Sequence, residues 1–175
     1  LHASIPHILF NMYALVAFGA GLERNLGHAR FLLLYVLAGF SGYVMSFLLS
    51  DGFSVVASTS IFGLVGAEGV FLYQNRRLLG DQFGRAIRNV VFIVAVNLAL
   101  GMTPGIDNWG HIGGLLGGLI FAWFGGPTWE VRQSPIPGGG FEVTDTREAR
   151  GVIVGAASVV LIFGALAWYG LINPR

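Results

Sequence analysis

Apolar residues along this chain gather into six long stretches, which shorter polar segments separate. Crossing about 30 Å of hydrocarbon takes a helix about 20 residues, at about 1.5 Å each. Residues 31–50 are the clearest case, because twenty consecutive residues there carry no charge. The pattern predicts six transmembrane helices, over residues 7–22, 31–50, 58–74, 89–102, 109–124 and 152–172.

The segments between the first five stretches differ in arginine content, which sets orientation through the positive-inside rule. Residues 23–30 and 75–88 contain two and four arginines, whereas residues 51–57 and 103–108 contain no Arg or Lys. We therefore expect 23–30 and 75–88 to face the cytoplasm, and 51–57 and 103–108 to face the outside. Residues 127–150 then lie in the cytoplasm.

Composition agrees with a membrane protein and excludes several classes of soluble protein. The chain is 54% hydrophobic and 11% charged, with a mean hydropathy of +0.70, whereas soluble domains are about a quarter charged. A net charge of +1 leaves no basic patch for a nucleic acid. The absence of cysteine excludes disulfides and cysteine nucleophiles. We expect an all-α polytopic transmembrane helix bundle, multi-pass in a bacterial plasma membrane, without nucleic-acid partners.

Four polar side chains lie at the outer ends of the predicted spans, where burial in hydrocarbon is costly. His7 and Asn11 are four residues apart and share one helical face. Ser58 begins the third span and His111 begins the fifth. A neutral imidazole that takes a hydroxyl proton turns a serine into a nucleophile, and a second His with an Asn suits stabilisation of an oxyanion.

Each of these residues also has an ordinary structural interpretation. Ser58 fits a helix N-cap, His111 fits a packed interfacial histidine, and His7 with Asn11 fits a polar pair at a helix start. Ser60 is a rival nucleophile two positions further on. The histidines do not cluster with carboxylates at metal-ligand spacing, so we expect no metal and no other cofactor.

Glycines in the fifth span recur at intervals that favour close helix packing. Gly110, Gly114 and Gly118 are spaced by four residues, and so are Gly113 and Gly117. Such ridges of small residues let helix backbones approach closely in lipid. The third span carries Gly63 and Ala67 at the same interval, so these two helices are expected to pack together, with Phe62 against the His111 imidazole.

These motifs, in this order, resemble the rhomboid intramembrane serine proteases. The residues that carry the resemblance are His7-Ile-Leu-Phe-Asn11, Ser58 followed by Ile61-Phe62-Gly63, and Asn108-Trp109-Gly110-His111. The resemblance implies a Ser–His dyad with Ser58 as nucleophile and His111 as general base. It further implies an oxyanion hole formed by His7, Asn11 and the Ser58 backbone N–H. The substrates it implies are transmembrane proteins, cleaved near the outer membrane face.

The resemblance also implies a domain organisation. Residues 1–126 correspond to a rhomboid-like core that lacks its first helix and the outer loop after it, so we expect an N-terminally truncated sequence. Residues 127–150 are expected to form a cytoplasmic linker, flexible because of the run from Pro135 to Gly140. Residues 151–175 are expected to form an additional C-terminal transmembrane helix. The oligomeric state is not predicted.

Two further hypotheses compete with a protease. The family's nucleophile motif has glycines where this chain has Val56 and Thr59, which motivates a catalytically weak or inactive rhomboid-like protein that binds client transmembrane helices. Glu68 lies within the third span, and an intramembrane acid can indicate a transporter. We expect Glu68 instead to pair with Arg24 or Tyr73 on the inner side.

Overall fold

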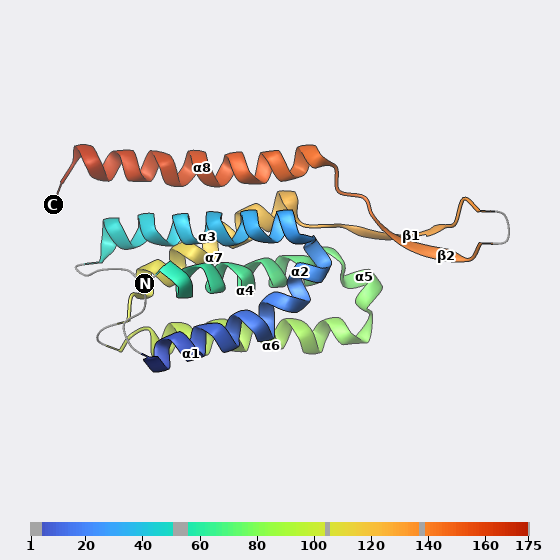
Figure 1. The fold of residues 1–175 in the computed structure, drawn as a ribbon, viewed down its shortest axis with the longest axis horizontal. Helices are drawn as coiled ribbons and strands as arrows, with labels where there is room; N and C mark the ends of the chain where they lie inside the picture. The colour runs from blue at the N-terminus through green and yellow to red at the C-terminus, as the bar shows by residue number, and fades with distance from the viewer. Residues whose placement is uncertain (1–4, 51–55, 104–105, 137–138, 175) are drawn as a thin grey trace.

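A computed structural model of the chain describes residues 5–50, 56–103, 106–136 and 139–174; the side chains of residues 5–7 and 56 are outside this part. The chain forms an all-α bundle with one short hairpin (Figure 1). The elements are α1 (Ile5–Ala14), the π-helix η1 (Leu15–Gly19), α2 (Ala20–Leu26), α3 (His28–Leu49), α4 (Val56–Gln74), α5 (Arg76–Leu79), α6 (Asp81–Leu100), α7 (Asn108–Gly125), β1 (Trp129–Gln133), β2 (Phe141–Asp145) and α8 (Ala149–Ile172).

Each predicted span corresponds to a helix or a helical run. The first prediction, residues 7–22, falls within the continuous run α1–η1–α2, which ends at Gly27, where φ is +80° and favours glycine. The prediction for α6 begins eight residues too late, at residue 89 rather than Asp81. Arg85 and Arg88 extend this helix beyond its apolar stretch, so hydropathy alone did not include them.

By length and composition, three of the described helices are able to cross a membrane: α3, α6 and α8. The helix α7 is shorter and contains six glycines, and it lies between α3 and α4 in the middle of the bundle. Six separate spans therefore stay a prediction, and the chain is an integral membrane protein whose central helices are covered by protein.

The glycines of α7 let it pack closely against two helices at once. A Cβ atom on Gly114 or Gly118 would collide with the backbone of Thr59 or Gly63 in α4. A Cβ atom on Gly113 would lie 2.6 Å from the Ser41 carbonyl oxygen in α3. The two glycine series therefore face different neighbours, and the predicted packing of α4 against α7 is confirmed.

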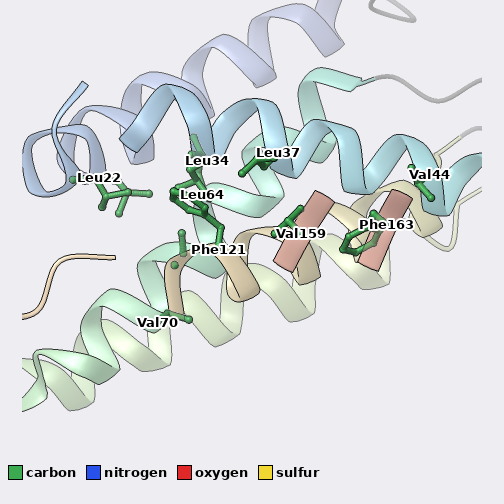
Figure 2. Packing of buried hydrophobic residues seen from close by; sticks show 12 residues of the cluster. Leu22, Leu34, Leu37, Val44, Leu64, Val70, Phe121, Val159 and Phe163 are labelled. Atoms are coloured by element: carbon green, nitrogen blue, oxygen red, sulfur yellow. The ribbon is translucent and has the colours of Figure 1, made fainter. Parts of the chain in front are cut away.

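The apolar core lies where α3, α4, α7 and α8 meet (Figure 2). Leu34, Leu64 and Phe121 are fully buried there, together with Val159 and Phe163 of α8. Thus α8 packs onto the bundle as part of its core.

Residues 129–145 contain a β-hairpin in place of the predicted flexible linker. β1 and β2 pair antiparallel, with Val131 opposite Val143, and extend past the ends of the helices (Figure 1). Alternation of apolar and charged residues in Trp129–Gln133 and Phe141–Asp145 suits a two-stranded ribbon. The prediction considered the Pro/Gly run between the strands and overlooked this alternation.

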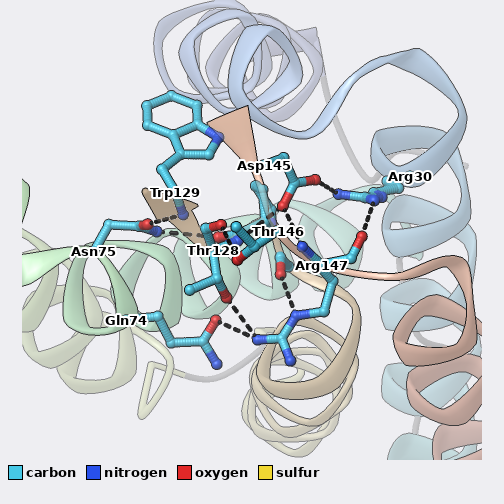
Figure 3. Close-up of polar contacts among 10 residues, drawn as sticks. Arg30, Gln74, Asn75, Thr128, Trp129, Asp145, Thr146 and Arg147 are labelled. Atoms are coloured by element: carbon cyan, nitrogen blue, oxygen red, sulfur yellow. Dashed lines mark hydrogen bonds and ion pairs between the residues drawn. The ribbon is translucent and has the colours of Figure 1, made fainter. Parts of the chain in front are cut away.

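Hydrogen bonds attach the hairpin to the ends of α4 and α7 (Figure 3). The buried Asn75 side chain donates to the Pro127 carbonyl at 3.1 Å and accepts from the Trp129 backbone N–H at 2.7 Å. Arg147 donates to the Gly126 carbonyl at 2.9 Å and to the Thr128 hydroxyl at 2.9 Å. The hairpin is therefore held in one orientation on the bundle.

Candidate active site

The predicted nucleophile and base lie in the first turns of two neighbouring helices. Ser58 belongs to the first turn of α4, and His111 to the first turn of α7. Both residues are partly exposed. Because α4 begins at Val56, Ser58 lies inside the helix rather than at its N-cap position.

The α4–α7 contact brings the two candidate residues to the same junction. The rings of Phe62 and His111 stack with centroids 4.8 Å apart and planes 9° from parallel, which confirms the predicted packing. Ser58 precedes Phe62 by four residues and so lies on the same face of α4. Ser58 therefore lies one turn of α4 before the ring that stacks on His111.

The start of α7 is anchored by Asp107, which lies in the segment 103–108 expected to face outside. Its carboxylate accepts from the Gly110 backbone N–H at 3.0 Å and from the Ser50 hydroxyl at 2.6 Å. Its carbonyl accepts from the His111 backbone N–H at 3.2 Å. Aspartate is a preferred N-cap residue, so its position just before the predicted span 109–124 was a signal available in the sequence. Asp107 thus positions the backbone that carries His111.

Asn11 carries a buried hydrogen-bond donor on α1, the helix that contacts α4. The residue is 8% exposed, and its Nδ2 atom makes no hydrogen bond within the part of the chain that the structure describes. The helix α1 contacts α4, so Asn11 lies on a helix that neighbours the one carrying Ser58. A buried donor without a partner costs about 1–3 kcal/mol, which a bound anion offsets. His7 precedes Asn11 by one helical turn, but its side chain is outside the described residues.

Thr59, one of the two departures from the family motif, is directed away from the exposed junction. It is 1% exposed and fills a slot between α3 and α7. A Cβ atom on Gly110 would lie 2.9 Å from Thr59 Cγ2, and one on Gly42 would lie 2.5 Å from Thr59 Cβ. The slot exists because positions 42 and 110 are both glycine, so the Thr59 side chain fills the space that two larger side chains would otherwise occupy. The side chain of Val56, the other departure, is outside the described residues.

Ser60 and Glu68 do not join the junction. Ser60 is 2% exposed, so this rival nucleophile is buried in the helix packing. Glu68 lies ten residues beyond Ser58, about 15 Å deeper along α4. Among the described residues it forms no ion pair, and the predicted pairing with Arg24 or Tyr73 is absent there.

Comparison with known sequences gives a consistent picture. A sequence model of the Rhomboid domain matches residues 1–128. RHOMBOID-like protein 1 of Arabidopsis thaliana is 40% identical over 121 residues, which are 69% of this chain and 31% of that protein. RHOMBOID-like protein 6, mitochondrial, of the same plant is 41% identical over 120 residues, 68% of this chain and 39% of that protein. Rhomboid protease GluP of Bacillus subtilis (strain 168) is 42% identical over 123 residues, 70% of this chain and 24% of that protein.

The chain therefore spans between a quarter and two fifths of the length of these curated relatives. One of them is named as mitochondrial and another is bacterial, so the bacterial plasma membrane stays a prediction for this chain. The hairpin and α8 follow the matched region.

Proposed function

This chain belongs to the rhomboid family, and from that premise we propose that it is a serine endopeptidase that cleaves transmembrane protein substrates near the outer membrane face. Ser58 is the nucleophile and His111 is the general base. The stacking of Phe62 on His111, one turn from Ser58, is the observation that carries the proposal. It supports an imidazole held in a fixed orientation beside the start of α4.

In this mechanism His111 takes the proton of the Ser58 hydroxyl as Oγ attacks the scissile carbonyl carbon. The resulting oxyanion is stabilised by donors that point at developing charge: the Asn11 amide, His7 and the Ser58 backbone N–H. His111 then gives its proton to the leaving amine, and an acyl-enzyme remains on Ser58. Water hydrolyses this ester with His111 again as base, which restores the free hydroxyl.

Three features of the described residues support these roles. The partial exposure of Ser58 and His111 suits a reaction that consumes water. The buried Nδ2 atom of Asn11, which has no hydrogen-bond partner among the described residues, suits a donor that binds an oxyanion. Thr59 packs into a glycine-lined slot between α3 and α7, so the fold accommodates the side chain that departs from the family motif.

The test is covalent labelling of the full-length protein, reconstituted in lipid, with a fluorophosphonate probe. The parent and Ser60→Ala are expected to label on Ser58, whereas Ser58→Ala is expected to lose the label. His111→Ala is expected to label far more slowly, because the hydroxyl then lacks its base. Labelling that persists in Ser58→Ala contradicts the assignment of the nucleophile.

The alternative, an inactive rhomboid-like protein that binds client transmembrane helices, rests on Val56 in place of the family's glycine. A transmembrane reporter separates the two functions. A protease releases a cleaved product that Ser58→Ala abolishes. Capture of the intact reporter, equal in the parent and in Ser58→Ala, with no product from either, favours the client-binding protein.

A further inference from the structure

A second feature lies on the side of the bundle that α6 covers. An apolar groove of about 650 Å³ opens between α6 and α7, with α4 as its floor. Gly66 and Gly69 give the floor its depth, because neither has a side chain to fill the space. Val91 and Leu98 of α6 and Leu119 of α7 form the walls.

The lining of the groove on α6 is about as long as one leaflet of a bilayer is thick. Its lining on α6 runs from Ile87 to Leu98, a rise of about 16 Å, and half of the hydrocarbon core is about 15 Å. On α4 the lining begins at Gly66, eight residues or about 12 Å beyond Ser58. By the orientation predicted from the arginines, Tyr73 and Trp123 lie at the cytoplasmic end of the groove, and Leu98 and Leu115 lie toward its outer end.

The cytoplasmic end of the groove carries an aromatic pair and a cation. Tyr73 and Trp123 both line the groove and stack with ring centroids 6.1 Å apart. The Arg76 guanidinium carbon lies 4.4 Å from the centroid of the Tyr73 ring. Aromatic rings and arginines of this kind are typical of the headgroup level of a membrane.

A second cation, Arg88, lies on α6 next to the groove-lining residue Ile87. Arg88 precedes Val91 by one turn of α6, so it continues the face that lines the groove. Its side chain extends toward the start of the helix, since a Cβ atom on Gly84 would lie 3.5 Å from Arg88 Nη1. Among the described residues neither Arg76 nor Arg88 is paired with a carboxylate. Two uncompensated cations therefore flank an apolar groove one leaflet long.

We propose that this groove binds an anionic phospholipid of the cytoplasmic leaflet, with one acyl chain against Gly69 and Val91 and the phosphate held by Arg76 and Arg88. The positive charge of the two arginines favours an anionic lipid over an apolar protein helix as the occupant of the groove. An apolar helix of a partner protein fits the groove walls but has no anion for the two arginines. The proposal is independent of proteolysis, because it concerns residues that take no part in the proposed reaction.

The test uses Trp123 as a reporter inside the groove. Full-length protein with Trp109, Trp129 and Trp168 changed to Phe is reconstituted in phosphatidylcholine vesicles that contain increasing fractions of brominated phosphatidylglycerol. Bromine quenches tryptophan on contact, so quenching of Trp123 is expected to saturate at a low fraction of this lipid. Brominated phosphatidylcholine at the same fraction is expected to quench less and without saturation.

Variants distinguish lipid binding in the groove from general attraction of anionic lipids to a positively charged surface. An arginine near an anionic membrane surface contributes about 5-fold in binding, so the double variant Arg76→Gln/Arg88→Gln is expected to need about 25-fold more phosphatidylglycerol. Arg150→Gln, the same change at the start of α8, is expected to leave the titration unchanged. Gly69→Leu is expected to abolish saturation without altering charge, and a Cβ atom there makes only an ordinary 3.4 Å contact.

Equal quenching by both lipids, no shift in the double variant, or an equal shift in Arg150→Gln overturns the proposal. Saturable quenching that Gly69→Leu leaves intact also contradicts it, because the lipid then binds elsewhere. If neither brominated lipid quenches Trp123, the groove is occupied by protein, either a partner helix or a second copy of the chain. This result also contradicts the proposal.

Discussion

The contact between α4 and α7 depends on the absence of a single side chain at Gly114. A Cβ atom at this position would collide with the carbonyl group of Thr59 and lie 3.2 Å from its Cα. These are backbone atoms of a helix, so no side chain can rotate to make room. To restore an ordinary contact of 3.4 Å, α7 must move away from α4 by on the order of 1 Å.

The variant Gly114→Ala is therefore expected to lower the free energy of unfolding by about 1–3 kcal/mol, the usual cost of overpacking. A gap of 0.5–1 Å also removes about a quarter to a half of the dispersion energy of each affected contact. The same shift moves His111 relative to Ser58, and a misplacement of about 1 Å can lower a catalysed rate about 100-fold. Peptidase activity is thus expected to fall more than stability does.

The matched control is Gly164→Ala in α8, where an added Cβ atom meets nothing within 4 Å. Alanine favours a helix over glycine by about 1 kcal/mol, so this variant is expected to be neutral or stabilising. Unfolding is followed by circular dichroism during titration of micelles with sodium dodecyl sulfate, and cleavage by release of a fluorescent reporter. Equal stability of Gly114→Ala and the parent, or equal losses in both variants, would refute the packing argument.

Further predictions concern the positioning groups and the hairpin. Asp107→Ala is expected to cost about 1 kcal/mol as a lost N-cap, and Asp107→Asn to recover most of it, as measured in the same unfolding titration. Phe62→Leu is expected to lower the maximal cleavage rate more than substrate affinity, since it removes a ring contact worth about 0.5–1.5 kcal/mol that holds His111; an unchanged rate contradicts that role. Asn75→Ala is expected to leave the Trp129 N–H unpaired, which lowers the free energy of unfolding by about 1–3 kcal/mol and speeds hydrogen exchange in β1. The control Arg132→Gln breaks only an exposed ion pair, so it is expected to change neither the stability nor the exchange rate. Cleavage is expected to fall at acid pH as His111 becomes protonated and stops acting as a base, so a rate that stays flat into acid pH argues against it.

The helices and their glycine ridges were predictable because both are local properties of the sequence. Hydropathy over about 20 residues marks each span, and an interval of four residues brings Gly110, Gly114 and Gly118 onto one face. The approach of Phe62 to His111 followed from that interval, from the position of Phe62 one turn beyond Ser58 and from the position of His111 at a helix start. The roles of Ser58 and Asn11 in catalysis were inferred from residue type and order, and they stay predictions.

Contacts between segments distant in the sequence were decided only by the tertiary structure. The slot that holds Thr59 needs Gly42 of α3 beside Gly110 of α7, two residues that no local pattern connects. Asn75 and Trp129 are 54 positions apart in the sequence and are joined by a hydrogen bond. This bond orients a hairpin in a segment that composition had predicted to be a linker. Periodicity states which residues share a face of one helix, whereas the partner of that face depends on how all the helices pack together.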